Sequence, residues 1–359
     1  MIFLRRPALA PIATLTLIAL LAAFYILSKG RETDQAQPGS ITLPEIDLAV
    51  YFTDPSGPNA ETLRGGPDAA LALAIDSARY SVDVAVYQLN LWSVRDALLR
   101  AHRRGLRVRL VTDSDNILEA EIGEIQAAGI AILGDRRESL MHHKFVVIDQ
   151  LEVWTGSMNL TVSDAYRNNN HLLRLQSSTL ADDYTREFEE MFLEDRFGAL
   201  SLPDTPHPQV EVAGVMVEVY FSPDDGVATR LMERIRGAQR SVHLLAFAFT
   251  SQEIGRAVLE RAAEGVEVRA VLEASQAAGI GSQYESLQAG GAQVRLDGNR
   301  HNMHHKVIIL DEKIVILGSY NFTRSAETQN DENLLIIHDP ALAEQFLAEF
   351  ARVFAEAPP

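Results

Sequence analysis

Two copies of one unit of strands and helices make up most of the chain, and this repeat constrains the fold more than any other feature. The first copy opens at 48–53 (LAVYFT) and the second at 217–222 (VEVYFS). Helical stretches then alternate with short apolar runs, such as 81–89 (SVDVAVYQL) and 241–249 (SVHLLAFAF). Because such alternation is typical of an α/β fold with a largely parallel sheet, the sequence predicts two pseudo-symmetric α/β sandwich domains that share one cleft.

The regions outside the repeats predict a membrane anchor and two linkers. Residues 8–27 carry no charge and are almost all apolar, and about 20 such residues span a bilayer as a helix. A cleaved signal peptide is the alternative. Arg5 and Arg6 precede the span, which favours a cytoplasmic N-terminus and a catalytic body outside the cytoplasm. The predicted parts are a cytoplasmic segment at 1–7, a single-pass anchor at 8–27, a linker at 28–45, the first domain at 46–199, a proline-containing linker at 200–214 and the second domain at 215–359.

Composition excludes some chemistry. The chain has no cysteine, so disulfides, cysteine-bound zinc and thiol catalysis are ruled out. The formal net charge is −17, and an acidic protein repels polyanions at long range. This charge disfavours a nonspecific nucleic-acid clamp, although a locally basic groove is compatible with it.

The pattern His-x-Lys-x4-Asp-x6-Gly-Ser-x-Asn occurs once in each copy. Its positions are His142, Lys144, Asp149, Ser157 and Asn159 in the first copy, and His304, Lys306, Asp311, Ser319 and Asn321 in the second. Each residue type alone is common in surfaces and turns, so one occurrence would mean little. Recurrence of the whole pattern at one spacing makes it the candidate active site.

The apolar run after each lysine indicates a strand. Alternation along a strand puts His142 and Lys144 on one face, and His143 and Asp149 on the other. The whole motif, aspartates included, is the predicted catalytic set. Within it, the alternation assigns substrate contact to the outer histidine and the lysine. We expect the middle histidines, His143 and His305, and the motif aspartates to brace the scaffold.

These residue types point to phosphodiester chemistry. Lysines and amide donors suit the nonbridging oxygens of a phosphodiester. One imidazole can attack phosphorus to form a phosphohistidine, while the other protonates the leaving oxygen and then activates water. Because the lysines supply positive charge, the sequence predicts no metal and no cofactor.

The motifs resemble those of the phospholipase D superfamily, over nearly all of residues 47–355. The stretch 318–337 (GSYNFTRSAETQNDENLLII) is similar to the branch that includes small bacterial endonucleases and mitochondrial cardiolipin hydrolase. The resemblance implies a pair of α/β sandwiches, metal-independent catalysis and a covalent histidine intermediate. It implies that His142, Lys144 and Asn159 meet His304, Lys306 and Asn321 at the phosphate, with Ser157 and Ser319 at the family's serine positions.

The two copies differ at one position that matters in that branch. There, an acidic residue 28 positions after the motif histidine orients an imidazole. The second copy has Glu332 at this position, whereas the first has Asn170. In two-repeat relatives the acid tends to cross the interface, so the resemblance favours Glu332 supporting His142. That would make His142 the nucleophile and His304 the acid and base, with the reverse assignment left open.

The motif does not distinguish a phospholipid substrate from a nucleic-acid substrate. A tethered body outside the cytoplasm favours phospholipid, and DNA or RNA is the alternative, since the bonds are chemically alike. A basic groove would favour nucleic acid, and it could be built from Arg136, Arg137, Arg167, Arg295, Arg300 and Arg324. Tyr87, Tyr166 and Tyr320 could line the pocket or pack in the core. A binding protein with a decayed site is a third reading, and no obligate protein partner is implied.

Overall fold

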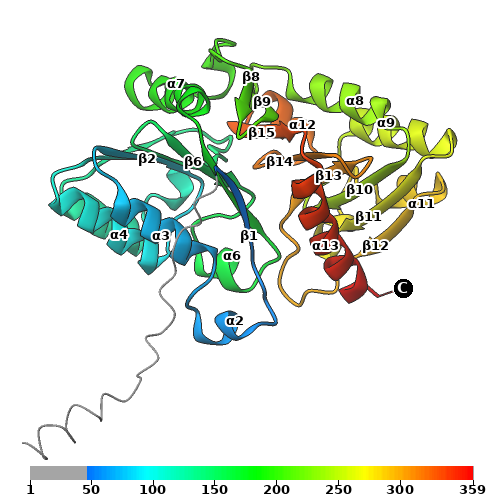
Figure 1. The fold of residues 1–359 in the computed structure, drawn as a ribbon, viewed down its shortest axis with the longest axis horizontal. Coiled ribbons are helices and arrows are strands. Elements are labelled where there is room, and N and C mark those ends of the chain that lie inside the picture. Colours follow the sequence, from blue (N-terminus) through cyan, green and yellow to red (C-terminus); the bar gives the residue numbers. More distant parts are fainter. Residues whose placement is uncertain (1–46, 359) are drawn as a thin grey trace, which may run out of the picture. The chain divides into compact units, whose positions relative to one another are not determined.

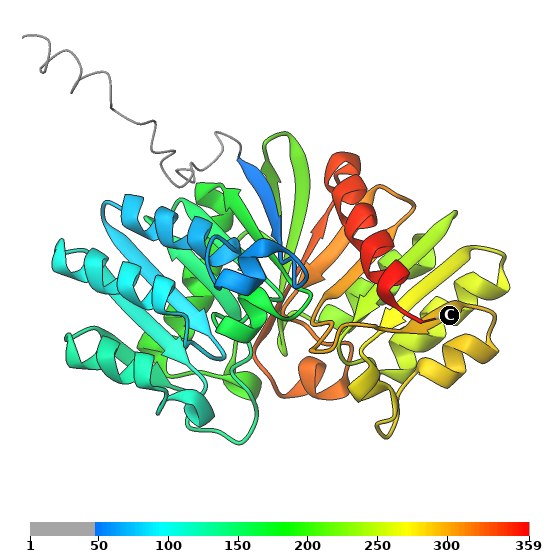
Figure 2. The same ribbon diagram turned by 90° about the horizontal axis from the view of Figure 1, so that it is seen from below.

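The computed structural model describes residues 47–358 (Figures 1 and 2). The predicted segments at 1–7, 8–27 and 28–45 lie outside the described residues. Within the described residues, no helix has the length and apolar character needed to cross a bilayer.

The first half holds a seven-stranded sheet in the order β1-β7-β6-β5-β2-β3-β4 (Figure 1). Its strands are β1 Leu48–Phe52, β2 Ser81–Val86, β3 Arg107–Thr112, β4 Ala131–Gly134, β5 Lys144–Ile148, β6 Glu152–Gly156 and β7 His171–Gln176. Its helices are α2 Pro58–Thr62, α3 Pro67–Ser77, α4 Trp92–Arg103, α5 Ala120–Ala127, α6 Val162–Tyr166 and α7 Ser178–Glu194, with 3-10 turns at Ser114–Asn116 and Gly198–Leu200.

The second half repeats this plan in an eight-stranded sheet with the order β12-β11-β10-β13-β14-β15-β9-β8. Its strands are β8 Gln209–Val212, β9 Val215–Ser222, β10 Ser241–Ala246, β11 Glu267–Leu272, β12 Gln293–Leu296, β13 Lys306–Leu310, β14 Ile314–Gly318 and β15 Glu332–Ile337. Its helices are α8 Val227–Gly237, α9 Gln252–Ala263, α10 Ala274–Ala277, α11 Tyr284–Ala289, α12 Arg324–Thr328 and α13 Pro340–Glu356. The segment predicted as a linker, 200–214, contains β8, which pairs antiparallel with β9.

Both sheets are mixed, so the expectation of largely parallel sheets is wrong. In the first half β2, β3 and β4 are parallel neighbours, whereas β5, β6, β7 and β1 pair antiparallel. The second half shows the same division. The connections between strands explain this mixture of directions. Helices return the chain between the parallel strands, whereas the short segments 149–151 and 311–313 join β5 to β6 and β13 to β14. Such a short connection reverses the chain direction.

Helices cover both sheets, and the two halves share one hydrophobic core. Helices α3, α4 and α5 pack on the outer face of the first sheet, and α8, α9 and α11 pack on the outer face of the second (Figures 1 and 2). Helix α7 contacts β2, β3, β5 and β6, and α13 contacts β10, β11, β13 and β14. Apolar side chains from α7, α13 and both sheets form a single buried cluster. The two halves are therefore joined by a continuous hydrophobic interior, which holds the seam between them in one geometry.

Candidate active site

The motif histidines lie at the seam between the halves, each just before a central strand. His142 precedes β5, and its backbone N–H donates to the carbonyl of Asp331 at 2.9 Å. In the equivalent contact, the N–H of His304 donates to the carbonyl of Asn169, also at 2.9 Å. Each histidine is thus fixed by backbone of the other half, and both are almost fully buried.

The side-chain partners of the two imidazoles also come from across the seam. Nδ1 of His142 lies 2.7 Å from a carboxylate oxygen of Glu332, the first residue of β15. Nδ1 of His304 lies 3.1 Å from the amide oxygen of Asn170, the residue before β7. The crossed arrangement that the resemblance implied for Glu332 and His142 is therefore present. With Nδ1 occupied in each ring, Nε2 is the nitrogen left for a substrate.

The motif lysines lie beside the histidines and are less than 3% exposed. Nζ of Lys144 donates to the carbonyl of His142 at 2.7 Å, and Nζ of Lys306 donates to that of His304 at 2.9 Å. Burial lowers the pKa of Lys144 to about 8, although Glu332 and Asp164 oppose this effect. Burial and the nearby Lys144 also lower the pKa of Lys306 well below its usual value, opposed by Asp164 and Glu332.

Burial is also the main influence on the imidazoles and their carboxylate. It lowers the pKa of His142 and of His304 well below the usual value, and Lys144 and Lys306 add to this effect on both rings. Burial raises the pKa of Glu332 to about 7, opposed by Lys144. Because burial disfavours the charged forms of these lysines and imidazoles, an anionic phosphodiester would stabilise them in the protonated state.

The Gly-Ser-x-Asn segments turn the chain tightly beside the histidines. Gly156 has a φ of +154°, and a Cβ there would lie 2.5 Å from the carbonyl oxygen of His171, so only glycine fits. Ser157 Oγ donates to the Asn170 amide oxygen at 2.9 Å, and Ser319 Oγ accepts the N–H of Asn333 at 3.0 Å. These serines position the segments that support the imidazoles.

The motif asparagines each have a buried side-chain oxygen without a hydrogen-bond partner in the described chain. The Asn159 backbone N–H donates to Asp164 at 2.7 Å. The side-chain oxygens of Asn159 and Asn321 are buried without a hydrogen-bond partner among the described residues. Each of these oxygens is an acceptor that the described residues leave unused.

The middle histidines brace helices rather than facing the site. His143 Nε2 lies 2.8 Å from Glu187 of α7, and His305 Nε2 lies 3.0 Å from Glu349 of α13. Strand alternation predicted that these histidines brace the scaffold, without naming the partners, and both contacts agree with that expectation.

The motif aspartates, predicted as part of the catalytic set, lie at the far ends of β5 and β13. Asp149 accepts backbone N–H groups of residues 79–81 at 2.7–2.9 Å. Asp311 accepts those of residues 239–241 in the same way. Each aspartate follows its lysine by five positions, a distance of roughly 16 Å along a strand. Both aspartates therefore anchor the start of a neighbouring strand.

Aromatic side chains close over the motif residues. The Tyr87 ring centroid lies 5.3 Å from that of His142 and 5.5 Å from Lys144 Nζ. Phe247 holds the equivalent place, at 4.6 Å from the His304 ring and 4.7 Å from Lys306 Nζ. Tyr320 is buried and donates to Glu327, so it packs in the core. The aromatic pair follows β2 and β10, and matching positions in the repeat could have identified Phe247 from the sequence.

Sequence reasoning also missed Asp164, a buried residue of α6 whose Oδ2 lies 3.6 Å from Nδ1 of His304. The signal was available, because Asp164 and Ala326 stand at the same distance after Ser157 and Ser319. A carboxylate in one copy and alanine in the other is a difference between the halves comparable to that between Asn170 and Glu332.

The six arginines near the motifs do not form one continuous groove. Arg136 pairs with Asp195, Arg137 pairs with Asp331, and Arg295 donates to the carbonyl of Phe354 at 2.9 Å. Arg324, at the start of α12, is exposed and apart from the pocket described next.

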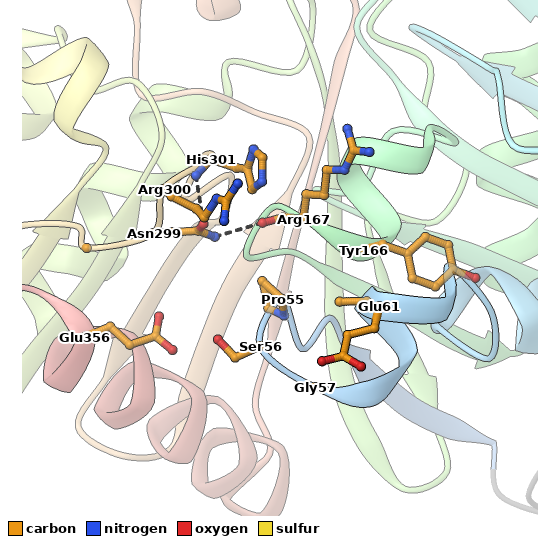
Figure 3. A pocket seen from close by; sticks show the side chains of 12 residues that line it. Pro55, Ser56, Gly57, Glu61, Tyr166, Arg167, Asn299, Arg300, His301 and Glu356 are labelled. Atoms are coloured by element: carbon orange, nitrogen blue, oxygen red, sulfur yellow. Dashed lines mark hydrogen bonds between the residues drawn. The ribbon is translucent and has the colours of Figure 1, made fainter.

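Arg167 and Arg300 instead line a pocket of about 660 Å³ at the seam (Figure 3). Asn299, Arg300 and His301 from the second half face Tyr166 and Arg167 from the first, and Asn299 donates to the Arg167 carbonyl at 3.0 Å. Within residues 47–358, neither arginine has a carboxylate partner within ion-pairing distance, although Glu61 and Glu356 also line the pocket. The loop that carries Arg300 leads directly into Met303 and His304.

Sequence comparisons point to one group of proteins. Residues 71–192 and 231–354 match the family model described as "Cardiolipin synthase, PLD-like domain", once in each half. A mitochondrial cardiolipin hydrolase of Mus musculus is 40% identical over 131 residues, which is 36% of this chain and 59% of that protein. The chain thus spans less than two thirds of that relative's length. A phospholipase D of Rickettsia bellii is 30% identical over 159 residues, covering 43% of this chain and 79% of that protein.

Comparison with solved structures extends the likeness to both halves. The phosphatidylserine synthase of Haemophilus influenzae superposes with a TM-score of 0.64, covering 89% of this chain and 88% of that one. Its sequence identity is 14%, so it supports the shared fold and not a shared substrate.

Proposed function

The chain belongs to the phospholipase D superfamily, and from this premise we propose that it is a phosphodiesterase that hydrolyses phospholipids through a covalent phosphohistidine. The observation that carries the proposal is the convergence of His142–Lys144 and His304–Lys306 at the seam, each imidazole held at Nδ1 by the opposite half. Two cations and two imidazoles that share one site suit a phosphodiester anion.

In the proposed first step, Nε2 of His142 attacks phosphorus and the bond from phosphorus to the leaving oxygen breaks. His304 donates its proton to that oxygen, so the alcohol leaves neutral. In the second step, water attacks the phosphohistidine while His304 takes a proton from it. The N–P bond breaks, a phosphomonoester is released and both imidazoles return to their starting states.

Glu332 supports the choice of His142 as nucleophile. A carboxylate 2.7 Å from Nδ1 stabilises the positive charge that develops on the ring as Nε2 bonds to phosphorus. Asn170 gives His304 an acceptor without charge. Lys144, Lys306, Asn159 and Asn321 supply donors for the nonbridging oxygens, and the lysines make a metal unnecessary.

Two observations favour a lipid substrate. Relatives named cardiolipin hydrolase and phospholipase D match the chain at 30–40% identity. The apolar segment 8–27, proposed as a single-pass anchor with the catalytic body outside the cytoplasm, would hold the site near a bilayer. Cleavage of DNA or RNA is the second candidate, favoured by Arg167 and Arg300 beside the pocket at the seam. A purely binding role is a minor alternative.

The test is a parallel assay of phosphatidylcholine, cardiolipin, single-stranded DNA and RNA with EDTA present, and His142→Asn as the control. We expect phosphatidic acid or phosphatidylglycerol products from lipid, at rates that EDTA leaves unchanged. Cleavage of nucleic acid with intact lipid would replace the lipid proposal with the second candidate. Turnover of no phosphodiester by the wild-type protein would refute both.

A further inference from the structure

At two equivalent positions near the site, each half has one acidic residue, and it stands at the position where the other half has none. Seven residues after the motif serine, the first half has Asp164 and the second has Ala326. Thirteen residues after the serine, the first half has Asn170 and the second has Glu332. Each half therefore contributes one acid from this pair of positions.

Asp164 lies where a carboxylate for His304 is needed. It is 3% exposed, and its Oδ2 lies 3.6 Å from Nδ1 of His304, behind the Asn170 oxygen that accepts the ring N–H. The backbone N–H of Asn159 and the side-chain amide of Asn168 each donate to one oxygen of Asp164. Burial raises the pKa of Asp164, whereas these two donors and the nearby Lys306 and Lys144 favour its ionised form.

The charges of the buried site also call for a second anion. Lys144 and Lys306 bring two ammonium groups out of water, and both experience the fields of Glu332 and Asp164. A buried ion without a counter-ion is strongly destabilising. Asp164 and Glu332 both favour the charged form of the two lysines, together with Asp113 at Lys144 and Glu273 at Lys306.

We propose that Asp164 is the positioning residue of His304, and that it performs from a different backbone position the role that Glu332 performs for His142. This inference rests on the proposed function, because it assumes that both imidazoles act on one phosphorus. Asn170 fixes the ring orientation, and Asp164 supplies the negative charge that stabilises the imidazolium when His304 holds the proton for the leaving oxygen.

The groups around His304 make this charge consequential. Lys306, Lys144, His142 and His305 all oppose protonation of the ring. Asp164 is the carboxylate within ion-pairing distance of it in the described chain. Without that carboxylate, the ring would hold its proton only at lower pH.

The experiment measures the pKa of His304 by NMR of ¹³C-labelled histidine in the wild type, in Asp164→Asn, and in Asp164→Ala combined with Asn170→Glu. We expect the pKa to fall by about one unit in Asp164→Asn. The double variant moves the carboxylate to the place it has in the other half and should restore the pKa. It does not restore the hydrogen bonds to Asn159 and Asn168, so recovery reports charge rather than local structure.

Turnover of bis(p-nitrophenyl) phosphate provides the second readout. Because a p-nitrophenyl leaving group needs little help from an acid, kcat reports His304 as the base of the hydrolysis step. The acidic limb of kcat should therefore move to lower pH by about one unit in Asp164→Asn and return in the double variant. An unchanged His304 pKa in Asp164→Asn, or no recovery in the double variant, would overturn the inference. If Asp164→Asn does not fold, the ¹³C carboxyl chemical shift of Asp164 is measured in the wild type instead. A carboxyl group that stays protonated while His304 titrates would also overturn the inference. The NMR readouts need no substrate, so they separate this inference from the proposed function.

Discussion

Glu332 of the second half lies 2.7 Å from Nδ1 of His142 in the first half, across 190 residues of sequence. The equivalent partner of His304 is an amide, Asn170, at 3.1 Å. A site with pseudo-symmetric backbone is therefore built with chemically different partners for its two imidazoles. This difference is the basis for assigning different tasks to them.

Replacing Glu332 tests its support of His142. We expect Glu332→Gln to lower kcat on bis(p-nitrophenyl) phosphate by about 10²–10⁴-fold, because an amide cannot stabilise the charged ring. The matched control is Glu187→Gln, which changes the carboxylate that holds His143. This control should alter the melting temperature but keep kcat close to wild type. Equal losses of kcat in the two variants would contradict the assignment.

Trapping the covalent intermediate tests which histidine is the nucleophile. A p-nitrophenyl leaving group needs little help from an acid, so His304→Asn should form the phosphohistidine on His142 but hydrolyse it slowly. Intact mass spectrometry after rapid acid-free quenching should then show the adduct in His304→Asn and none in His142→Asn. The opposite pattern would exchange the roles of the two residues.

The pKa of Lys144 predicts the pH dependence of anion binding. Burial lowers this pKa to about 8, so the ammonium is charged below that pH and neutral above it. Sulfate keeps one charge state in this range, so its Kd should rise as the pH increases through about 8. Calorimetric titration from about pH 6 to about pH 10 would measure the change. Lys144→Arg is the control, because its charge persists and the step near 8 should disappear.

The motif aspartates are predicted to matter for stability rather than for chemistry. Asp149→Asn weakens three charged hydrogen bonds to the start of β2, so we expect a loss of about 1–3 kcal/mol in the free energy of unfolding. Asp311→Asn should have the same effect on β10. Urea unfolding and kcat would be measured together. A large drop in kcat with unchanged stability would return the aspartates to the catalytic set.

The pocket at the seam separates the two candidate substrates. We expect Arg167→Ala combined with Arg300→Ala to leave turnover of bis(p-nitrophenyl) phosphate unchanged, because no motif residue lines the pocket that these arginines share. If nucleic acid is the substrate, the same double variant should weaken its binding and reduce the salt dependence of the affinity. Arg324→Ala is a matched surface control. Unchanged turnover of every polymeric substrate would remove these arginines from recognition.

Much of the fold and of the site could be predicted from the repeat and the motif. Identical spacing in two copies predicted two equivalent halves, and period-two alternation separated His142 and Lys144 from His143 and Asp149. The strand directions were not predictable in this way. Whether a sheet is parallel depends on how the chain returns, and the short turns at 149–151 and 311–313 reverse it. The same local pattern also gave no sign that β8 would extend the second sheet.

By itself, the sequence determined the identity of the reactive groups, because the choice of residue types at fixed spacing is a local property of each copy. Only the tertiary structure decided which acidic residue supports which histidine. Asp164 and Glu332 reach opposite imidazoles because backbone pairing and a shared apolar core bring the halves together along one seam. The resulting distances to Nδ1 of the histidine are 3.6 Å for Asp164 and His304 and 2.7 Å for Glu332 and His142. Both depend on how the two halves pack, so they cannot be predicted from a pattern within one copy.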